Sequence, residues 1–112
     1  MLFTDYLRSI NISPEIYFNV ASMFALNNGY DPSVLKFSNK QKLSYNGIHF
    51  GAKYNVATGK FNNDYIIYLL KHDENAHKYR DNYLRRTDNI SGNWRNNLQS
   101  KNSLSRNILW FA

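Results

Sequence analysis

Apolar and polar residues alternate with a helical period over the first third of the chain. This pattern predicts a short helix over Phe3–Ser9, which Asn11–Ser13 interrupts. Ser13 is typical of an N-cap, Pro14 of a first helical residue, and Gly29 of the position that follows a helix. We therefore expect a second helix over residues 14–28, with an apolar stripe directed at the core that comprises Ile16, Val20, Met23, Phe24 and Asn27.

The middle of the chain predicts a β-hairpin. After Asp31, Pro32 opens about one helical turn. Two short alternating runs, over residues 42–45 and 48–51, then flank Asn46-Gly47, the pair that favours a type I′ turn. The side chains expected to pack from this hairpin are Leu43, Tyr45, Ile48 and Phe50.

The remainder predicts helices joined by polar loops. A loop over residues 52–63 leads to Asp64, which is placed to cap a helix over residues 65–70, although this β-branched run also fits a buried strand. Asp73 or Asn75 then begins a helix over about residues 74–87. An Asn-rich loop follows over residues 88–102, and Ser103 is placed to cap a final helix over residues 104–111.

These elements predict an α+β fold, a small and mostly helical single domain with one short Asn-Gly β-hairpin. The domain spans residues 1–112, with an N-terminal helical segment (1–35), the hairpin (42–51) and a basic helical region (64–112). A chain of 112 residues with 43% hydrophobic residues supports one modest core. At 16% aromatic, that core is expected to consist largely of rings.

The amino-acid composition excludes several classes of functional site. The chain has no cysteine, which excludes disulfides, thiol catalysis and cysteine-bound zinc or iron–sulfur sites. The absence of cysteine also favours an intracellular, reducing compartment, because small secreted domains usually carry disulfides. No apolar run approaches the ~20 residues that span a bilayer, so we expect no membrane span.

Charge is distributed unevenly. The formal net charge is +6, but residues 1–35 carry −2 and residues 36–112 carry +8. One positive side is expected to attract nucleic acid, anionic lipid or an acidic protein surface, although a charge of this size also simply keeps a small protein soluble.

The predicted helix over residues 74–87 concentrates this charge. At about 100° per residue, Ala76, Tyr79 and Tyr83 share one face, while cations share much of the other. Arginine grips phosphate with two hydrogen bonds, and asparagine can support it. The candidate nucleic-acid or partner-binding residues are Lys78, Arg80, Asn82, Arg85, Arg86, Trp94, Arg95 and Arg106. A solvated helix face explains the cations equally well, and packing over the core is favoured over base stacking for Trp94.

Catalytic and metal sites find little support. His72 and His77 lie five residues apart, not the four that brings two imidazoles onto one helix face. A metal-dependent nuclease built from Asp64, Asp73 and Glu74 lacks the usual strand context, and no glycine-rich phosphate loop is present. We expect no catalytic residue, no metal, no cofactor and no small-molecule substrate.

Several segments together resemble a protein family. These are Asn28–Ser33 (NGYDPS), His49–Ala52 (HFGA), Asp64–Tyr68 (DYIIY), the basic Tyr/Arg helix over 80–86, Gly92–Trp94 (GNW) and Leu104–Trp110 (LSRNILW). In that order they look like a small, basic family of large nucleocytoplasmic DNA viruses, virophages and polinton-like viruses. The resemblance spans about residues 27–110 and implies a viral source, but no catalytic residue.

Two functions are therefore expected as alternatives. The first is a non-enzymatic viral accessory protein that binds the phosphate backbone of nucleic acid, in the virion or in the viral factory of an infected cell. The second is a structural minor capsid or cement protein, whose basic face docks on acidic capsid proteins and whose exposed Tyr and Trp rings anchor the contact.

Overall fold

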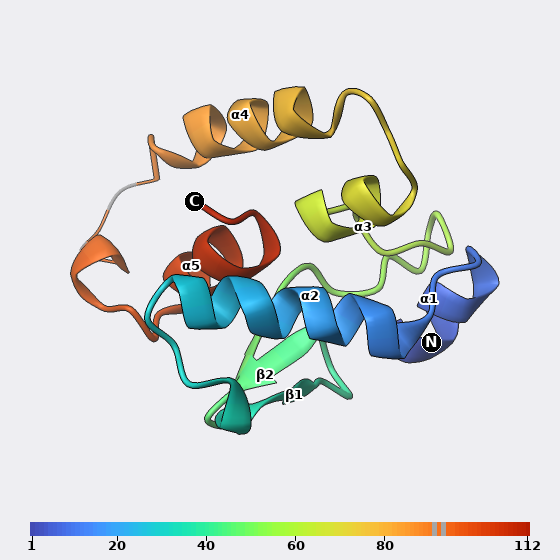
Figure 1. Cartoon of the computed structure of the whole chain (residues 1–112), viewed down its shortest axis with the longest axis horizontal. Coiled ribbons are helices and arrows are strands. Elements are labelled where there is room, and N and C mark those ends of the chain that lie inside the picture. The colour runs from blue at the N-terminus through green and yellow to red at the C-terminus, as the bar shows by residue number, and fades with distance from the viewer. Residues whose placement is uncertain (91, 93) are drawn as a thin grey trace.

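The N-terminal helices begin and end close to their predicted positions. The computed structural model describes residues 1–90, 92 and 94–112, and in it α1 spans Phe3–Ser9 and α2 spans Pro14–Asn27 (Figure 1). The Ser13 hydroxyl accepts a hydrogen bond from the Ile16 amide at 3.4 Å, which is the expected N-cap. Gly29 follows the helix with φ of +84°, a conformation that glycine adopts without strain.

The predicted apolar stripe of α2 is wrong. Tyr17, Ala21 and Ala25 form the buried line of this helix, whereas Ile16 and Met23 are 53% and 62% exposed. The predicted Val20 and Phe24 are only partly buried. α2 also packs against the C-terminal segment Ser105–Leu109. The rotation of a helix is thus decided by what packs on it, not by its most hydrophobic side chains.

The hairpin is confirmed, and it belongs to a larger sheet. Strands β2 (Leu43–Tyr45) and β3 (Ile48–Phe50) pair antiparallel around Asn46-Gly47, whose φ values of +49° and +83° suit a type I′ turn. The sequence did not predict β1 (Leu35–Phe37), which pairs antiparallel with β2 to give the order β1-β2-β3. Three residues are too few to show a strand period, so β1 depends on its pairing with β2.

Helices follow the loop over 52–63. α3 spans Tyr65–Leu70, and the strand alternative for this run is wrong because Asp64 accepts the Ile67 amide at 2.9 Å as an N-cap. α4 spans Ala76–Thr87 and so begins two residues later than predicted.

The last helix begins before its predicted start. α5 spans Lys101–Leu104 and continues as a π-helical turn over Ser105–Leu109. Ser100 is its N-cap, since the Ser100 hydroxyl accepts from the Ser103 amide at 3.2 Å. Ser103 lies inside the helix, and its hydroxyl instead donates to the Trp94 carbonyl at 2.7 Å.

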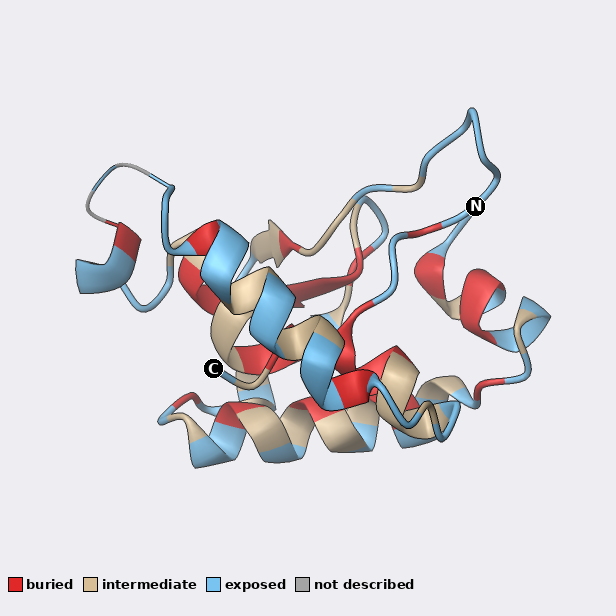
Figure 2. Cartoon of the chain, turned by 90° about the horizontal axis from the view of Figure 1, so that it is seen from above, coloured by how far each residue is buried: buried red, intermediate tan, exposed pale blue. Residues whose placement is uncertain are grey.

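These elements form one small α+β unit, as predicted. Figure 1 shows α4 along one side, α2 across the middle and the sheet on the side away from α4. α2 and α4 both alternate buried or half-buried residues with exposed ones (Figure 2). α4 therefore exposes part of its surface, which includes Lys78, Arg85 and Arg86.

Within the described residues, every helix is too short or too polar to cross a membrane.

Candidate functional site

Tyrosines fix the inner face of α4, as the sequence predicted. The Tyr79 ring lies 4.4 Å from the Tyr68 ring of α3, and Tyr83 stacks on Trp110 with centroids 4.2 Å apart and planes within 8°. Ala76 is buried beneath the first turn. Aromatic pairs of this geometry stabilise a helix beyond the area that they bury. Ring contacts thus hold α4 against the protein at Tyr79 and Tyr83.

One side of α4 carries cations that are not paired with acids. Arg86 does not lie opposite the tyrosines as predicted, since its guanidinium lies over the Tyr83 ring at 5.8 Å. Lys78, Asn82, Arg85 and Arg86 are all exposed. The ion pairs among the described residues involve none of these three cations. Arg85 reaches only the Asn82 side-chain oxygen, at 3.5 Å. These residues form the basic face of α4, which we define as Lys78, Asn82, Arg85 and Arg86.

Arg80 points elsewhere. Its guanidinium lies over the Tyr65 ring at 5.1 Å, and its side chain is 28% exposed. The Nε atom is 3.7 Å from an Asp81 carboxylate oxygen, too far for a hydrogen bond, and is left buried without a partner. Arg80 is therefore a half-buried neighbour of the basic face and not part of it.

Two other predicted arginines, Arg95 and Arg106, share the carboxylate of Asp88. The Arg106 guanidinium donates to the Leu84 carbonyl at 3.1 Å and to the Thr87 hydroxyl, and it pairs with Asp88 at 3.1 Å. Arg95 also pairs with Asp88, at 3.0 Å.

Trp94 lies between these arginines. The Arg95 and Arg106 guanidinium carbons are 4.3 and 5.2 Å from its ring centre, and its indole donates to the Ile90 carbonyl at 3.0 Å. With Trp94 only 9% exposed, its geometry matches the packing role favoured from the sequence. Arg106, Arg95 and Trp94 are thus engaged in contacts within the protein.

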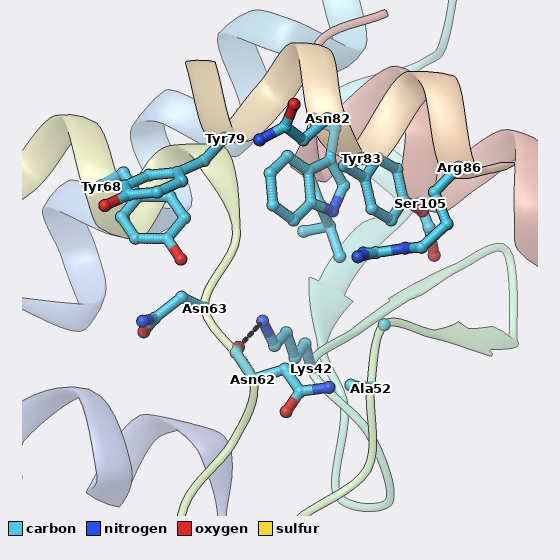
Figure 3. A pocket seen from close by; sticks show the side chains of 13 residues that line it. Lys42, Ala52, Asn62, Asn63, Tyr68, Tyr79, Asn82, Tyr83, Arg86 and Ser105 are labelled. Atoms are coloured by element: carbon cyan, nitrogen blue, oxygen red, sulfur yellow. Dashed lines mark hydrogen bonds between the residues drawn. The ribbon is translucent and has the colours of Figure 1, made fainter. Parts of the chain in front are cut away.

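A cavity of about 510 Å³ lies under α4, and no sequence pattern predicted it. Figure 3 shows Arg86 extending into it from α4, Asn82 at its rim on the same helix, Tyr68 and Tyr79 at one end, and Lys42, Asn62 and Asn63 opposite. We call this cavity the α4 pocket. Its remaining lining residues are Gly51, Ala52, Tyr83, Ser105, Leu109 and Trp110.

A buried ion pair forms one wall of the α4 pocket. The Lys42 ammonium lies 2.8 Å from an Asp64 carboxylate oxygen, and the two side chains are 2% and 1% exposed. The same ammonium donates to the Asn62 carbonyl, and the Tyr17 hydroxyl donates to Asp64 at 2.7 Å. Burial, reinforced by the negative charge of Asp64, raises the pKa of Tyr17 well above its usual value, so this hydroxyl remains a donor.

Gly51 makes room for this lysine. Its φ is +88°, and a Cβ atom at this position would lie 2.8 Å from the Lys42 Cβ and 3.1 Å from a Leu109 methyl. Both the backbone conformation and the available space therefore require glycine here. The glycine of the HFGA segment positions Lys42 at the pocket.

Many polar groups of the pocket are open to a ligand. The hydrogen bonds drawn among its lining residues reduce to the one from Lys42 to the Asn62 backbone (Figure 3). Figure 3 draws no hydrogen bond from the Asn62 and Asn63 side-chain amides or from the Tyr68 and Tyr79 hydroxyls to another lining residue. Burial raises the pKa of Tyr83, with Arg106 and Arg86 opposing the shift, which keeps its phenol protonated at neutral pH.

Sequence reasoning found only two residues of this pocket, Asn82 and Arg86. Lys42, Asn62 and Asn63 come from segments distant from α4 in sequence, and no spacing rule joins them to it. Within the part of the chain that the structure describes, no three His, Cys, Asp or Glu residues gather as a metal site would require.

Comparison with known proteins gives no assignment. No protein-family model matches the chain. No curated protein matches it. No solved structure matches its fold. The function must therefore be inferred from the geometry of α4 and its pocket.

Proposed function

We propose that this protein binds nucleic acid through the phosphate backbone, using the basic face of α4, and that it does so without catalysis. The observation that carries the proposal is the set of exposed cations Lys78, Arg85 and Arg86, which have no acidic partner in the described residues. A cation without a competing carboxylate can neutralise a phosphate and release its counterion.

The contrast with the other arginines supports this assignment. Arg95 and Arg106 share Asp88, so their charge is partly neutralised within the protein. Arg80 and Arg86 both lie over tyrosine rings, but Arg86 is exposed whereas Arg80 is half-buried. The proposed interface is therefore narrower than the sequence suggested. The family resemblance supports a viral setting for this binding, in the virion or in the viral factory.

Salt dependence tests the proposal. We expect duplex DNA affinity to fall steeply with salt, and the Lys78→Ala, Arg85→Ala double variant to reduce the slope of log affinity against log salt by about 2, at about 0.9 per lost phosphate contact. Both residues are exposed, so the fold should be retained.

A charge-matched control is Lys36→Ala with Lys40→Ala, two exposed lysines on and after β1, on the side away from α4 (Figure 1). This variant should keep the wild-type slope. Binding that ignores salt, or an equal loss of slope in the control, would overturn the proposal.

A second candidate, docking on a viral capsid, is favoured by a different surface. The exposed face of α2 presents Ile16, Met23 and Leu26, which are 53%, 62% and 64% exposed and which suit a protein contact. The Tyr and Trp anchors expected from the sequence are less suitable, since Trp94 and Trp110 are buried. Co-purification with shells emptied of genome, lost in Ile16→Ser with Met23→Ser, would support capsid docking. Absence of co-purification of the wild-type protein would contradict capsid docking.

A further inference from the structure

The α4 pocket and the basic face of α4 share Asn82 and Arg86. Arg86 is exposed on the helix and also lines the cavity, where Figure 3 shows its guanidinium extending toward the space between Tyr83 and Lys42. A strand held on the basic face would thus pass directly beside the mouth of the pocket. This continuity indicates that the two features serve one ligand.

We propose that the α4 pocket binds one nucleoside phosphate unit, with its phosphate on Arg86 and its sugar and base edges on the amides and hydroxyls of the lining. The proposal rests on the proposed function insofar as the unit belongs to a nucleic acid strand held by α4. A free nucleotide offers the same chemistry, and the experiment below separates the two sources.

Charge favours an anionic ligand. No carboxylate lines the pocket among the described residues, and the nearby Asp64 is neutralised by Lys42 behind the wall. Arg86 is left as the accessible cation, and its planar guanidinium can form paired hydrogen bonds with a phosphate. An anionic group therefore enters this site without like-charge repulsion.

The neutral lining suits the remainder of a nucleotide. Asn62, Asn63 and Asn82 each offer an amide that donates and accepts, which is the pairing that base edges require. The Tyr68 and Tyr79 hydroxyls can bond sugar oxygens. The rings of Tyr79 and Tyr83 are already paired with Tyr68 and Trp110, so recognition here depends on hydrogen bonding and not on base stacking.

Size limits the form of the ligand. A volume of about 510 Å³ lies within the ~300–1,000 Å³ typical of small-ligand sites, which admits one nucleotide and not a base pair. A nucleotide in a duplex would have to unpair and unstack from its neighbours before it could enter the pocket. This step has a free-energy cost that is absent for an unpaired nucleotide in a single strand. The pocket should therefore favour single-stranded over duplex nucleic acid.

The test uses the full-length protein and three probes: adenosine 5′-monophosphate, a single-stranded oligonucleotide and the matching duplex. The pocket variant is Asn62→Ala with Asn63→Ala, and its matched control is Asn19→Ala with Asn39→Ala. All four asparagines are exposed, which keeps the fold intact. Affinity is measured by calorimetry, and binding is located by the side-chain amide resonances of Asn62, Asn63 and Asn82.

We expect the nucleotide and the single strand to shift these resonances. The pocket variant should weaken both about tenfold, through two lost hydrogen bonds, while its duplex affinity and the control stay at the wild-type level. Arg86→Gln should weaken nucleotide binding further. If the nucleotide binds and the single strand does not, the pocket is a site for free nucleotides. That result would overturn the proposal that the pocket and the basic face of α4 bind the same strand.

Two results would overturn the pocket itself. One is the absence of any resonance shift at millimolar nucleotide, and the other is equal affinity in the pocket variant and in wild type. The proposed function fails separately, if duplex binding ignores salt while the nucleotide still binds.

Discussion

Lys42 and Asp64 form an ion pair inside the protein, with the ammonium 2.8 Å from the carboxylate and both side chains almost fully buried. Lys42 immediately precedes β2, and Asp64 is the N-cap of α3. Such a pair costs desolvation free energy that its mutual attraction offsets only with good geometry and further hydrogen bonds. Here the Asn62 carbonyl and the Tyr17 hydroxyl supply those bonds.

Removing the lysine should therefore be severe. Lys42→Met leaves a buried carboxylate without its cation, and we expect the free energy of unfolding in urea to fall by about 3–5 kcal/mol. Adding Asp64→Asn should recover part of this loss, because an amide oxygen can still cap α3 and accept from Tyr17. The exposed Lys53→Met serves as control. A loss in Lys42→Met no larger than in that control would contradict the prediction.

Alkaline pH should destabilise the protein through Tyr17. The Tyr17 pKa is raised in the folded state from a usual value of 10.0, so the folded protein retains a proton that the unfolded chain releases. Stability from this group is thus complete below about pH 10 and is lost as pH rises further. In urea unfolding from about pH 9 to about pH 11, Tyr17→Phe should show a shallower decline than wild type, with Tyr6, Tyr30 and Tyr83 contributing the remainder. Equal slopes would count against a raised Tyr17 pKa.

Gly51→Ala should destabilise the protein by about 2–4 kcal/mol, because the new methyl group meets both a left-handed backbone and the Lys42 side chain. Gly47 provides the comparison, since its φ is also positive but no atom lies within 4 Å of the position that a methyl group would take there. Gly47→Ala should therefore cost only the backbone strain, about 1–2 kcal/mol. Thermal and urea unfolding of the two variants would measure the difference, and equal losses would refute the contact with Lys42.

Arg106→Gln should separate stability from binding. Arg106 is 14% exposed and bonds Leu84, Thr87 and Asp88, so its loss should lower the free energy of unfolding by about 1.5–3 kcal/mol. The salt dependence of duplex binding should stay at the wild-type value. Arg85→Ala, at an exposed position, should show the reverse behaviour. A smaller slope of log duplex affinity against log salt in Arg106→Gln would show that Arg106 does contact phosphate.

The parts of the fold that could be predicted from sequence are local. Ser13 and Asp64 cap helices through side chains within three residues, and Asn46-Gly47 determines a turn by its own backbone preferences. Each of these signals is complete within a few positions of the chain.

The features that the sequence did not predict correctly depend on residues that are distant in the chain. Ala21 and Ala25 are buried while the more hydrophobic Ile16 and Met23 are exposed, which depends on the elements that pack on α2. Strand β1 exists through its pairing with β2. The α4 pocket likewise brings Asn62 and Lys42 beside Arg86, and only the folded chain relates these positions.

Asp64 unites three parts of the chain through one carboxylate. One oxygen accepts the α3 amide of Ile67, and the other accepts from Tyr17 of α2 and pairs with Lys42 beside the sheet. Local opening of any one of these elements would leave a buried charge without its partners. We therefore expect them to open together as one cooperative unit. In hydrogen exchange, the Ile67 amide would then report global unfolding, and the wall of the α4 pocket would be among the last regions of the molecule to exchange.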